Sequence, residues 1–131
     1  GTLMRTCDAV GACIAVPWTP HYRSCLDRGD TLRLRPHIHK VRKRRSWLEA
    51  ERARGAEVIA VELAEDATPL GLVEPAHGRT VLLLGHEHHG VDEDVWDLID
   101  TVVEIPMHGV GASLNVAVAG SLVAYRLAGL A

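Results

Sequence analysis

Short apolar runs alternate along this chain with stretches in which apolar residues recur at helical spacing. Buried β-strands are expected at Ala12–Val16, Val58–Leu63, Thr80–Leu84 and Val102–Ile105. Helices are expected at Gly1–Val10, Trp47–Arg54, Asp92–Ile99 and Ser113–Leu127, with a short helix or turn at Thr19–Gly29. Strands that are continuously apolar and alternate with helices predict an α/β fold, with a parallel sheet covered by helices on both faces.

The region of the last expected strand, the loop after it and the last expected helix contains the most residues that indicate a ligand site. Pro106 ends the strand because proline has no N–H for a ladder, and Gly109 and Gly111 follow in a loop. Ser113 is in the position of a helix N-cap. The helix residues Leu114–Leu127 are apolar on almost every side, which indicates burial in a core or between subunits. A glycine loop that leads into a helix N-terminus is a natural ligand site.

Periodicity is weaker in two other regions. Asp30–Arg45 shows poor periodicity and is assigned no element, and Glu65–Gly78, which is interrupted by proline and glycine, is expected to be a loop. Ser46 is expected to cap the helix Trp47–Arg54, with Glu49 completing a capping box.

With 131 residues, the chain is expected to form a single domain, residues 1–131. Its net charge is −3, yet residues 1–56 carry +7 and residues 57–131 carry −10. Three cysteines without a C-x-x-C spacing indicate reduced thiols in a cytoplasmic protein. No apolar run approaches the ~20 residues of a membrane span, and no signal peptide is visible. The chain starts at Gly1 inside a motif, which indicates an incomplete N-terminus.

The excess of positive charge is concentrated in one basic segment, which contains no acid. Its cations are Arg33, Arg35, Lys40, Arg42, Lys43, Arg44 and Arg45. This composition is typical of phosphate contacts and predicts RNA binding. The alternative is a solvated surface, which is the commoner role of a run of charges.

Three stretches resemble, in order, the three motifs of the SpoU/TrmH-type RNA ribose 2′-O-methyltransferases of the SPOUT superfamily. GTLMRTCDAVGA (Gly1–Ala12) resembles the first motif, with its arginine at Arg5. LLLGHEHHGV (Leu82–Val91) resembles the second, and IPMHGVGASLNVAVA (Ile105–Ala119) resembles the third. The resemblance implies a SPOUT-type fold with a C-terminal trefoil knot, a homodimer, and S-adenosyl-L-methionine as cofactor.

The resemblance places the cofactor pocket between the second and third motifs. The implied cofactor-binding residues are Leu84, Gly85, Ile105, Met107, Ser113 and Leu114. Apolar walls would hold the adenine while backbone groups read its edge. On the pattern alone, glycine loops after strands are more often ordinary turns between a strand and a helix. Their spacing is not the G-x-G-x-x-G fingerprint of a Rossmann-type methyltransferase.

The resemblance also places Arg5 at the acceptor ribose, contributed by the partner subunit. An arginine is a poor general base, so we expect Arg5 to orient the 2′-OH and an adjacent phosphate and to stabilise the developing alkoxide. The alternative is a solvated helix arginine. Glu87, Ser113 and Asn115 complete the predicted catalytic set. Their alternative roles are an exposed loop acid, a helix cap and a buried amide that needs a hydrogen-bond partner.

Three histidines surround Glu87, and they raise the alternative of a metal-dependent hydrolase. His86, His88 and His89 do not form the H-E-x-x-H pattern, and adjacent residues cannot share one face of a helix. No metal is therefore expected.

Taken together, the sequence predicts transfer of a methyl group from S-adenosyl-L-methionine to a ribose 2′-OH of RNA. The RTCDAVG form of the first motif resembles the tRNA guanosine subgroup, so tRNA is favoured over ribosomal RNA. Ala117 stands where many family members have serine, which leaves open an RNA-binding dimer without turnover. The expected partners are RNA and a second copy of the chain, with no membrane.

Overall fold

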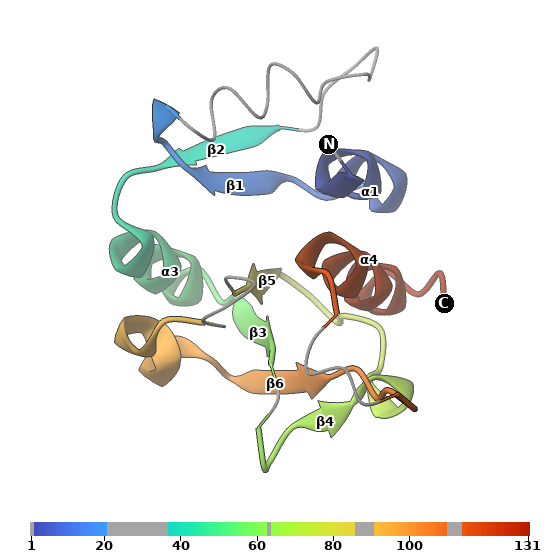
Figure 1. Ribbon diagram of the computed structural model, residues 1–131. Coiled ribbons are helices and arrows are strands. Elements are labelled where there is room, and N and C mark those ends of the chain that lie inside the picture. Colours follow the sequence, from blue (N-terminus) through green and yellow to red (C-terminus); the bar gives the residue numbers. More distant parts are fainter. Residues whose placement is uncertain (1, 21–36, 63, 86–90, 110–113) are drawn as a thin grey trace.

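The computed structural model describes residues 2–20, 37–62, 64–85, 91–109 and 114–131 (Figure 1). Helices and strands alternate in these ranges and keep the labels of Figure 1. They are α1 (Thr2–Val10), β1 (Ile14–Pro17), β2 (Ile38–Val41), α3 (Arg44–Ala53), β3 (Glu57–Val61), β4 (Thr68–Pro69), the 3₁₀ helix η1 (Leu70–Leu72), β5 (Thr80–Leu84), the 3₁₀ helix η2 (Glu93–Leu98), β6 (Thr101–Glu104) and α4 (Val116–Leu127).

The described strands form two parallel sheets. In the larger sheet β3 lies between β5 and β6, and β4 extends the sheet beyond β6. The smaller sheet pairs β1 with β2, from Ile14 opposite Ile38 to Pro17 opposite Val41. The predicted α/β class with parallel strands is therefore confirmed. β4 lies where the sequence pattern predicted a loop, and β2 lies in the segment to which the pattern assigned no element.

Alternate residues of β3 face two different apolar clusters. Val58 packs in one cluster with Leu48 of α3, and Ile59 packs in the other with Val103 of β6 and Val123 of α4. Burying an aliphatic side chain of this size contributes roughly 1.5–3 kcal/mol to stability. Helices therefore cover both faces of the larger sheet, as the alternation of strands and helices predicted.

Helix α4 approaches β5 and α1 closely at Gly120. A Cβ atom on Gly120 would lie 2.6 Å from Leu84 Cδ1 and 3.2 Å from Leu3 Cδ2. The absence of a side chain at this position therefore lets the helix sit against the strand. One turn along the same contact, the hydroxyls of Thr6 and Ser121 lie 2.7 Å apart and join α1 to α4.

The opposite side of α4 is open to solvent in the single chain. Val118, Leu122 and Tyr125 are 45%, 42% and 37% exposed, and their i, i+4, i+7 spacing places them on one face. One face of α4 is therefore buried in the core, as expected, and the other face stays a prediction of burial between subunits, which the single chain does not test.

Two helix starts differ from the sequence prediction. Helix α3 begins at Arg44, with Lys43 as its N-cap, so Ser46 lies inside the helix and the predicted capping box is wrong. The earlier start places Arg44 and Arg45 on the helix, where both guanidiniums reach carboxylates of η2. Helix α4 begins at Val116 rather than at the predicted serine cap, because a later side chain caps it.

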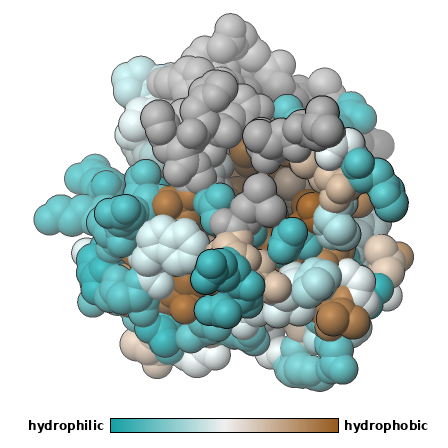
Figure 2. Space-filling view, turned by 60° about the horizontal axis from the view of Figure 1, so that its bottom comes forward, coloured by the Kyte–Doolittle hydropathy of each residue, from teal (hydrophilic) through white to brown (hydrophobic). Residues whose placement is uncertain are grey.

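The surface of the larger sheet's lower end is mostly polar. Figure 2 turns the lower end of Figure 1, where β4 and β6 lie, toward the viewer, and hydrophilic side chains cover most of this face. Apolar side chains appear between them in small patches. Within the described part of the chain, no helix combines the length and the apolar character needed to cross a bilayer.

Candidate functional site

The candidate site lies where β5 and β6 end on either side of β3. Because the three strands are parallel, Gly85 after β5 and Ile105 after β6 leave the sheet at the same edge. Leu84 is half-buried at the end of β5, opposite Val61, and its side chain lies against α4. The structure thus brings three of the predicted cofactor-binding residues to one edge.

Two exposed apolar side chains follow this edge along the chain. Met107 is 41% exposed and Leu114 is 37% exposed. Leu114 directly precedes the N-cap of α4, so it lies beside the amides at the start of that helix. Exposed apolar groups next to a helix N-terminus suit a ligand with an apolar ring and a polar part. A Cβ atom on Gly109 would meet no described protein atom within 4 Å.

Asn115 is the N-cap of α4 and is exposed. Its Oδ1 accepts hydrogen bonds from the backbone N of Ala117 at 2.9 Å and of Val118 at 3.3 Å. The prediction of a buried amide is wrong at this position, because the residue lies one step before the helix rather than inside it. Replacing an asparagine cap by alanine typically costs about 1 kcal/mol, so capping alone is a sufficient structural role.

Arg5 is exposed on α1, the helix that packs against α4. Its neighbour Thr6 is buried and makes the hydroxyl contact with Ser121. The helix that carries Arg5 is therefore fixed to the helix whose start adjoins the candidate loop.

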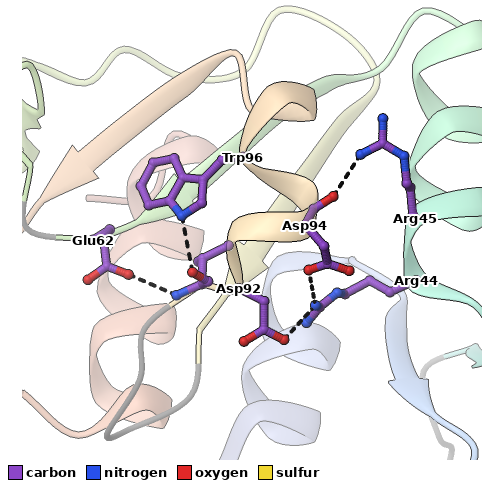
Figure 3. A network of polar contacts seen from close by, with 7 residues as sticks. Arg44, Arg45, Glu62, Asp92, Asp94 and Trp96 are labelled. Carbon is purple, nitrogen blue, oxygen red and sulfur yellow. Dashed lines mark hydrogen bonds and ion pairs between the residues drawn. The ribbon is translucent and has the colours of Figure 1, made fainter.

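Two cations of the basic segment are held by carboxylates of η2 and its start. Arg44 Nη2 lies 2.7 Å from Asp92 Oδ2 and 3.0 Å from Asp94 Oδ1 (Figure 3). Arg45 makes a bidentate pair with Asp97, with contacts of 2.8 and 2.7 Å. The hydrogen bond that Arg44 donates to Asp92 raises the pKa of Arg44, and the hydrogen bond that Arg45 donates to Asp97 lowers the pKa of Asp97.

Three other cations of the basic segment are exposed. Lys40 Nζ lies 4.6 Å from the centre of the Trp18 ring, a cation–π distance. In the described part of the chain, Arg42 and Lys43 make no ion pair. The structure therefore divides the segment: Lys40, Arg42 and Lys43 are available to phosphates, and the next two arginines already have carboxylate partners.

Several residues singled out from the sequence lie outside the described ranges. They are Arg33, Arg35, His86, Glu87, His88, His89 and Ser113. Among the residues that are described, no three His, Cys, Asp or Glu side chains come together as a metal site.

Sequence reasoning missed several polar contacts between distant segments. Glu51 is only 6% exposed, and its Oε2 accepts a hydrogen bond of 2.6 Å from Arg79 Nε. This hydrogen bond lowers the pKa of Glu51. The partners are 28 residues apart, and the hydroxyls of Thr6 and Ser121 are 115 residues apart. No local pattern signals such pairs.

The fold and the site define a parallel α/β protein whose candidate ligand edge is formed by two strand ends and a helix N-terminus. The model of the SpoU rRNA methylase family matches residues 1–125. The chain belongs to this family.

Named relatives and a solved structure agree with the family. The tRNA (guanosine(18)-2′-O)-methyltransferase of Thermus thermophilus is 32% identical over 132 residues, which cover 95% of this chain and 64% of that protein. The 23S rRNA (guanosine(2553)-2′-O)-methyltransferase RlmP of Bacillus subtilis is 31% identical over 134 residues, covering 98% and 52%. The SpoU methyltransferase AviRb from Streptomyces viridochromogenes, solved in complex with the cofactor AdoMet, is 26% identical with a TM-score of 0.69, covering 97% and 51%. The chain thus spans about half to two thirds of these proteins.

Proposed function

We propose that this chain is the methyltransferase domain of an enzyme that methylates ribose 2′-OH groups of RNA, with S-adenosyl-L-methionine as methyl donor. The observation that carries the proposal is the family match over residues 1–125. The structure supports it, because Gly85 and Ile105 lie at one sheet edge and the exposed Met107 and Leu114 follow along the chain.

The favoured substrate is tRNA, with methylation at a guanosine. The T. thermophilus relative is named for guanosine 18 of tRNA, and the first motif of this chain resembles that subgroup. Ribosomal RNA is the second candidate, supported by the name of the B. subtilis relative. Ala117 supports a third candidate, an RNA-binding dimer without turnover, since many family members have serine there.

The residues present fit the cofactor. Leu84, Gly85, Ile105, Met107, Ser113 and Leu114 would hold it, with apolar side chains against the adenine. When bound, S-adenosyl-L-methionine supplies an electrophilic methyl group on a sulfonium. The described members of this set leave apolar surface exposed at Met107 and Leu114, which a ligand would cover.

Arg5 is the proposed catalytic residue, acting on the ribose bound by the other subunit. An arginine guanidinium keeps its proton near neutral pH, so Arg5 orients the 2′-OH and stabilises the negative charge that develops on its oxygen. Its planar fork can hold an adjacent phosphate at the same time. The primary role of Glu87 and Ser113 is to stabilise the loops that contain them. Asn115 caps the helix that borders the site.

The proposed assembly is a homodimer with a SPOUT-type trefoil knot, located in the cytoplasm, where tRNA and ribosomes are found. The exposed face of α4 supports the dimer: Val118, Leu122 and Tyr125 form an apolar stripe that a second copy would cover. A site shared between the two subunits would also explain why Arg5 is exposed on its own subunit.

Transfer of labelled methyl groups tests the function. Purified protein is incubated with labelled S-adenosyl-L-methionine and with either unmodified tRNA or unmodified ribosomal RNA. Label in tRNA, located at a guanosine 2′-oxygen by nuclease digestion, is the expected result. Label in ribosomal RNA alone would favour the second candidate. Calorimetric binding of the cofactor to metal-free protein, without transfer to either RNA, would favour the third.

A further inference from the structure

Three aromatic side chains form a connected row where β2 leads into α3. The rings of His37 and His39 lie 4.5 Å apart, centre to centre, and meet edge to face. The rings of His39 and Trp47 lie 5.9 Å apart at a tilt of 58°. His37 is exposed, and the other two residues are half-buried. The row therefore presents part of its aromatic surface to solvent.

The backbone holds this row in place. Ile14 of β1 donates from its backbone N to the carbonyl of His37 at 3.0 Å, and His39 is paired with Ala15 in the parallel ladder. Trp47 lies in the first turn of α3 and packs against a buried apolar cluster. Rings that are fixed before binding lose little conformational freedom when a ligand covers them, which favours affinity.

Two exposed cations lie between the strand and the helix that carry the row. Only Arg42 and Lys43 separate β2 from α3, and Figure 1 shows the strand above the helix with this short turn between them. Trp47 is bonded directly to the turn, because its backbone N donates to the carbonyl of Lys43 at 3.1 Å. The row thus combines aromatic rings with adjacent positive charge.

Both acids of α3 are paired with other cations. Glu49 Oε1 lies 3.2 Å from Arg45 Nε. Glu51 Oε2 accepts the hydrogen bond of 2.6 Å from Arg79 Nε. These two carboxylates therefore balance the charge of arginines outside the turn, and the positive charge of the turn is available to an anion.

We propose that the row of His37, His39 and Trp47 is a surface on which unpaired bases of RNA stack. Arg42 and Lys43 bind phosphates of the same RNA strand. Aromatic side chains beside cations suit single-stranded RNA, because an unpaired base can offer its face for stacking. In a duplex the faces of the bases are covered by neighbouring base pairs. The inference rests on the proposed function and narrows its substrate from RNA to RNA with unpaired bases.

Replacement of the two histidines separates stacking from charge. His37→Ala combined with His39→Ala removes two rings. His37→Phe combined with His39→Phe keeps two aromatic rings and removes the imidazole nitrogens. His77→Ala is the matched control, because His77 is an exposed histidine in the segment before β5, 3.7 Å from a carboxylate oxygen of Glu74. Trp47 is left unchanged, because it also supports the buried cluster.

Fluorescence anisotropy titrations with three labelled RNAs provide the test. The first is a stem-loop with adenosines in its loop, the second is the same stem-loop with abasic loop residues, and the third is a duplex with the same number of phosphates. We expect the wild type to bind the adenosine loop about tenfold more tightly than the other two RNAs, the scale of one stacked base. The alanine pair should lose this preference by weakening only the adenosine complex. The phenylalanine pair and His77→Ala should keep it.

Three results would overturn the proposal. One is equal affinity of the wild type for the adenosine and abasic loops. Another is an equal loss of affinity for all three RNAs in the alanine pair, which would show that the rings do not stack on bases. The third is loss of the preference in the phenylalanine pair, which would assign it to the imidazole nitrogens. Should the alanine pair not fold, the exposed His37→Ala alone should reduce the preference about twofold, and an unchanged preference would overturn the proposal in its place.

Transfer of labelled methyl groups separates this proposal from the proposed function. Transfer to RNA by a wild type that shows no preference for the adenosine loop would refute the stacking surface alone. A clear preference without transfer to any RNA would support the surface and refute the enzymatic activity. Absence of binding to all three RNAs would overturn the stacking surface, and the transfer assay would then decide the proposed function independently.

Discussion

Two contacts between helices in this molecule differ in kind: one is formed by close packing and the other by ion pairs. Helix α1 meets α4 through close packing of Leu3 at Gly120 and through the hydroxyl pair of Thr6 and Ser121. Helix α3 meets η2 through three arginine–aspartate pairs on the surface, above a buried apolar layer. The first contact lies on the helix that carries Arg5. The second lies on the helix that starts within the basic segment.

The difference teaches which contact can change without loss of the fold. Exposed ion pairs contribute roughly 0–1 kcal/mol each and weaken in salt, so the polar layer of the α3–η2 contact can exchange partners with solvent or ligand. The closely packed α1–α4 contact cannot change in this way, because an added methyl group would overlap with neighbouring side chains. We therefore expect geometric precision at α1–α4 and adaptable charge at α3–η2.

The largest expected effect follows from removing Arg5. Arg5→Ala should reduce methyl transfer by at least ~100-fold, the scale of one transition-state contact of about 2.7 kcal/mol. Arg5→Lys should remain severely impaired, since an ammonium cannot reproduce a two-pronged contact. Single-turnover assays with labelled cofactor measure both variants.

Mixing variants shows whether Arg5 acts across a dimer. Gly109→Val should fold, because a Cβ atom there would meet no described protein atom within 4 Å. The added side chain should obstruct the candidate cofactor loop and weaken cofactor binding at least about tenfold, or 1.4 kcal/mol. In a mixed dimer of Arg5→Ala and Gly109→Val, one site combines an intact loop with an intact Arg5 from the partner. Activity should therefore reappear. No recovery after confirmed subunit exchange would mean that Arg5 serves its own subunit.

A smaller effect, on stability, is expected from filling the space at Gly120. Gly120→Val should lower the free energy of unfolding by about 2–3 kcal/mol, because its branched side chain must displace Leu84 and Leu3. Urea denaturation measures the change. Leu84→Ala in the same chain should relieve part of the overlap, so the two losses should not add. Full additivity would show that the α1–α4 contact is looser than the distances indicate.

The divided basic segment predicts a modest effect on RNA affinity. Replacing Arg42 and Lys43 with alanine should reduce the slope of log affinity against log salt by about 1.4–1.8, the value for two phosphates. Replacing Arg44 and Arg45 should change the slope less, because carboxylates already occupy those guanidiniums. Cofactor affinity provides the control for the first pair. Equal slopes for both pairs would mean that RNA displaces the η2 carboxylates.

The smallest effect concerns acid sensitivity at Glu51, whose pKa is lowered in the folded state by the hydrogen bond from Arg79. Its contribution is therefore complete above the unfolded pKa of about 4.3 and is lost as pH falls through the folded pKa. Glu51→Gln should cost about 1 kcal/mol at pH 7, since Arg79 is partly solvated, and less near pH 3, which lies below the unfolded pKa. Urea unfolding at both pH values measures the difference. A constant cost at both values would show that packing, rather than charge, sets the effect.

The sequence predicted features that depend on neighbouring residues and missed those that depend on distant ones. β5 appears at the predicted Thr80–Leu84, because five successive apolar or β-branched residues have few alternatives. β2 was missed because Ile38 and Val41 enclose His39 and Lys40, and pairing with β1 decides its conformation. For α4, the predicted cap was Ser113, whereas Asn115 caps the helix in the structure, a position that the sequence analysis had treated as an amide inside the helix.

The same limit applies to the candidate site. The motif residues Gly85 and Ile105 could be placed at one sheet edge because parallel strands require it. The partners of Arg44 and Arg45 are 48–52 residues away, so their pairing with η2 could not be foreseen. The hydrogen bond from the backbone amide of Val91 to Glu62 was not predicted either. Its two partners are 29 residues apart, and a backbone amide leaves no pattern in the sequence.

The pairing of α3 with η2 also has a consequence for encounter kinetics. The chain has a positive first part and a negative second part, and these arginine–aspartate pairs cancel charge where the two parts meet. Lys40, Arg42 and Lys43 stay exposed in the first part, so the difference in charge between the two parts of the sequence is only partly cancelled. An approaching RNA, which is a polyanion, is attracted by the cations of the first part and repelled by the excess of acids in the second part. It is therefore oriented before contact. By cancelling charge, the α3–η2 pairs would reduce the overall attraction of RNA and leave its orientation to the remaining exposed cations. The rate of association with RNA should fall as ionic strength rises.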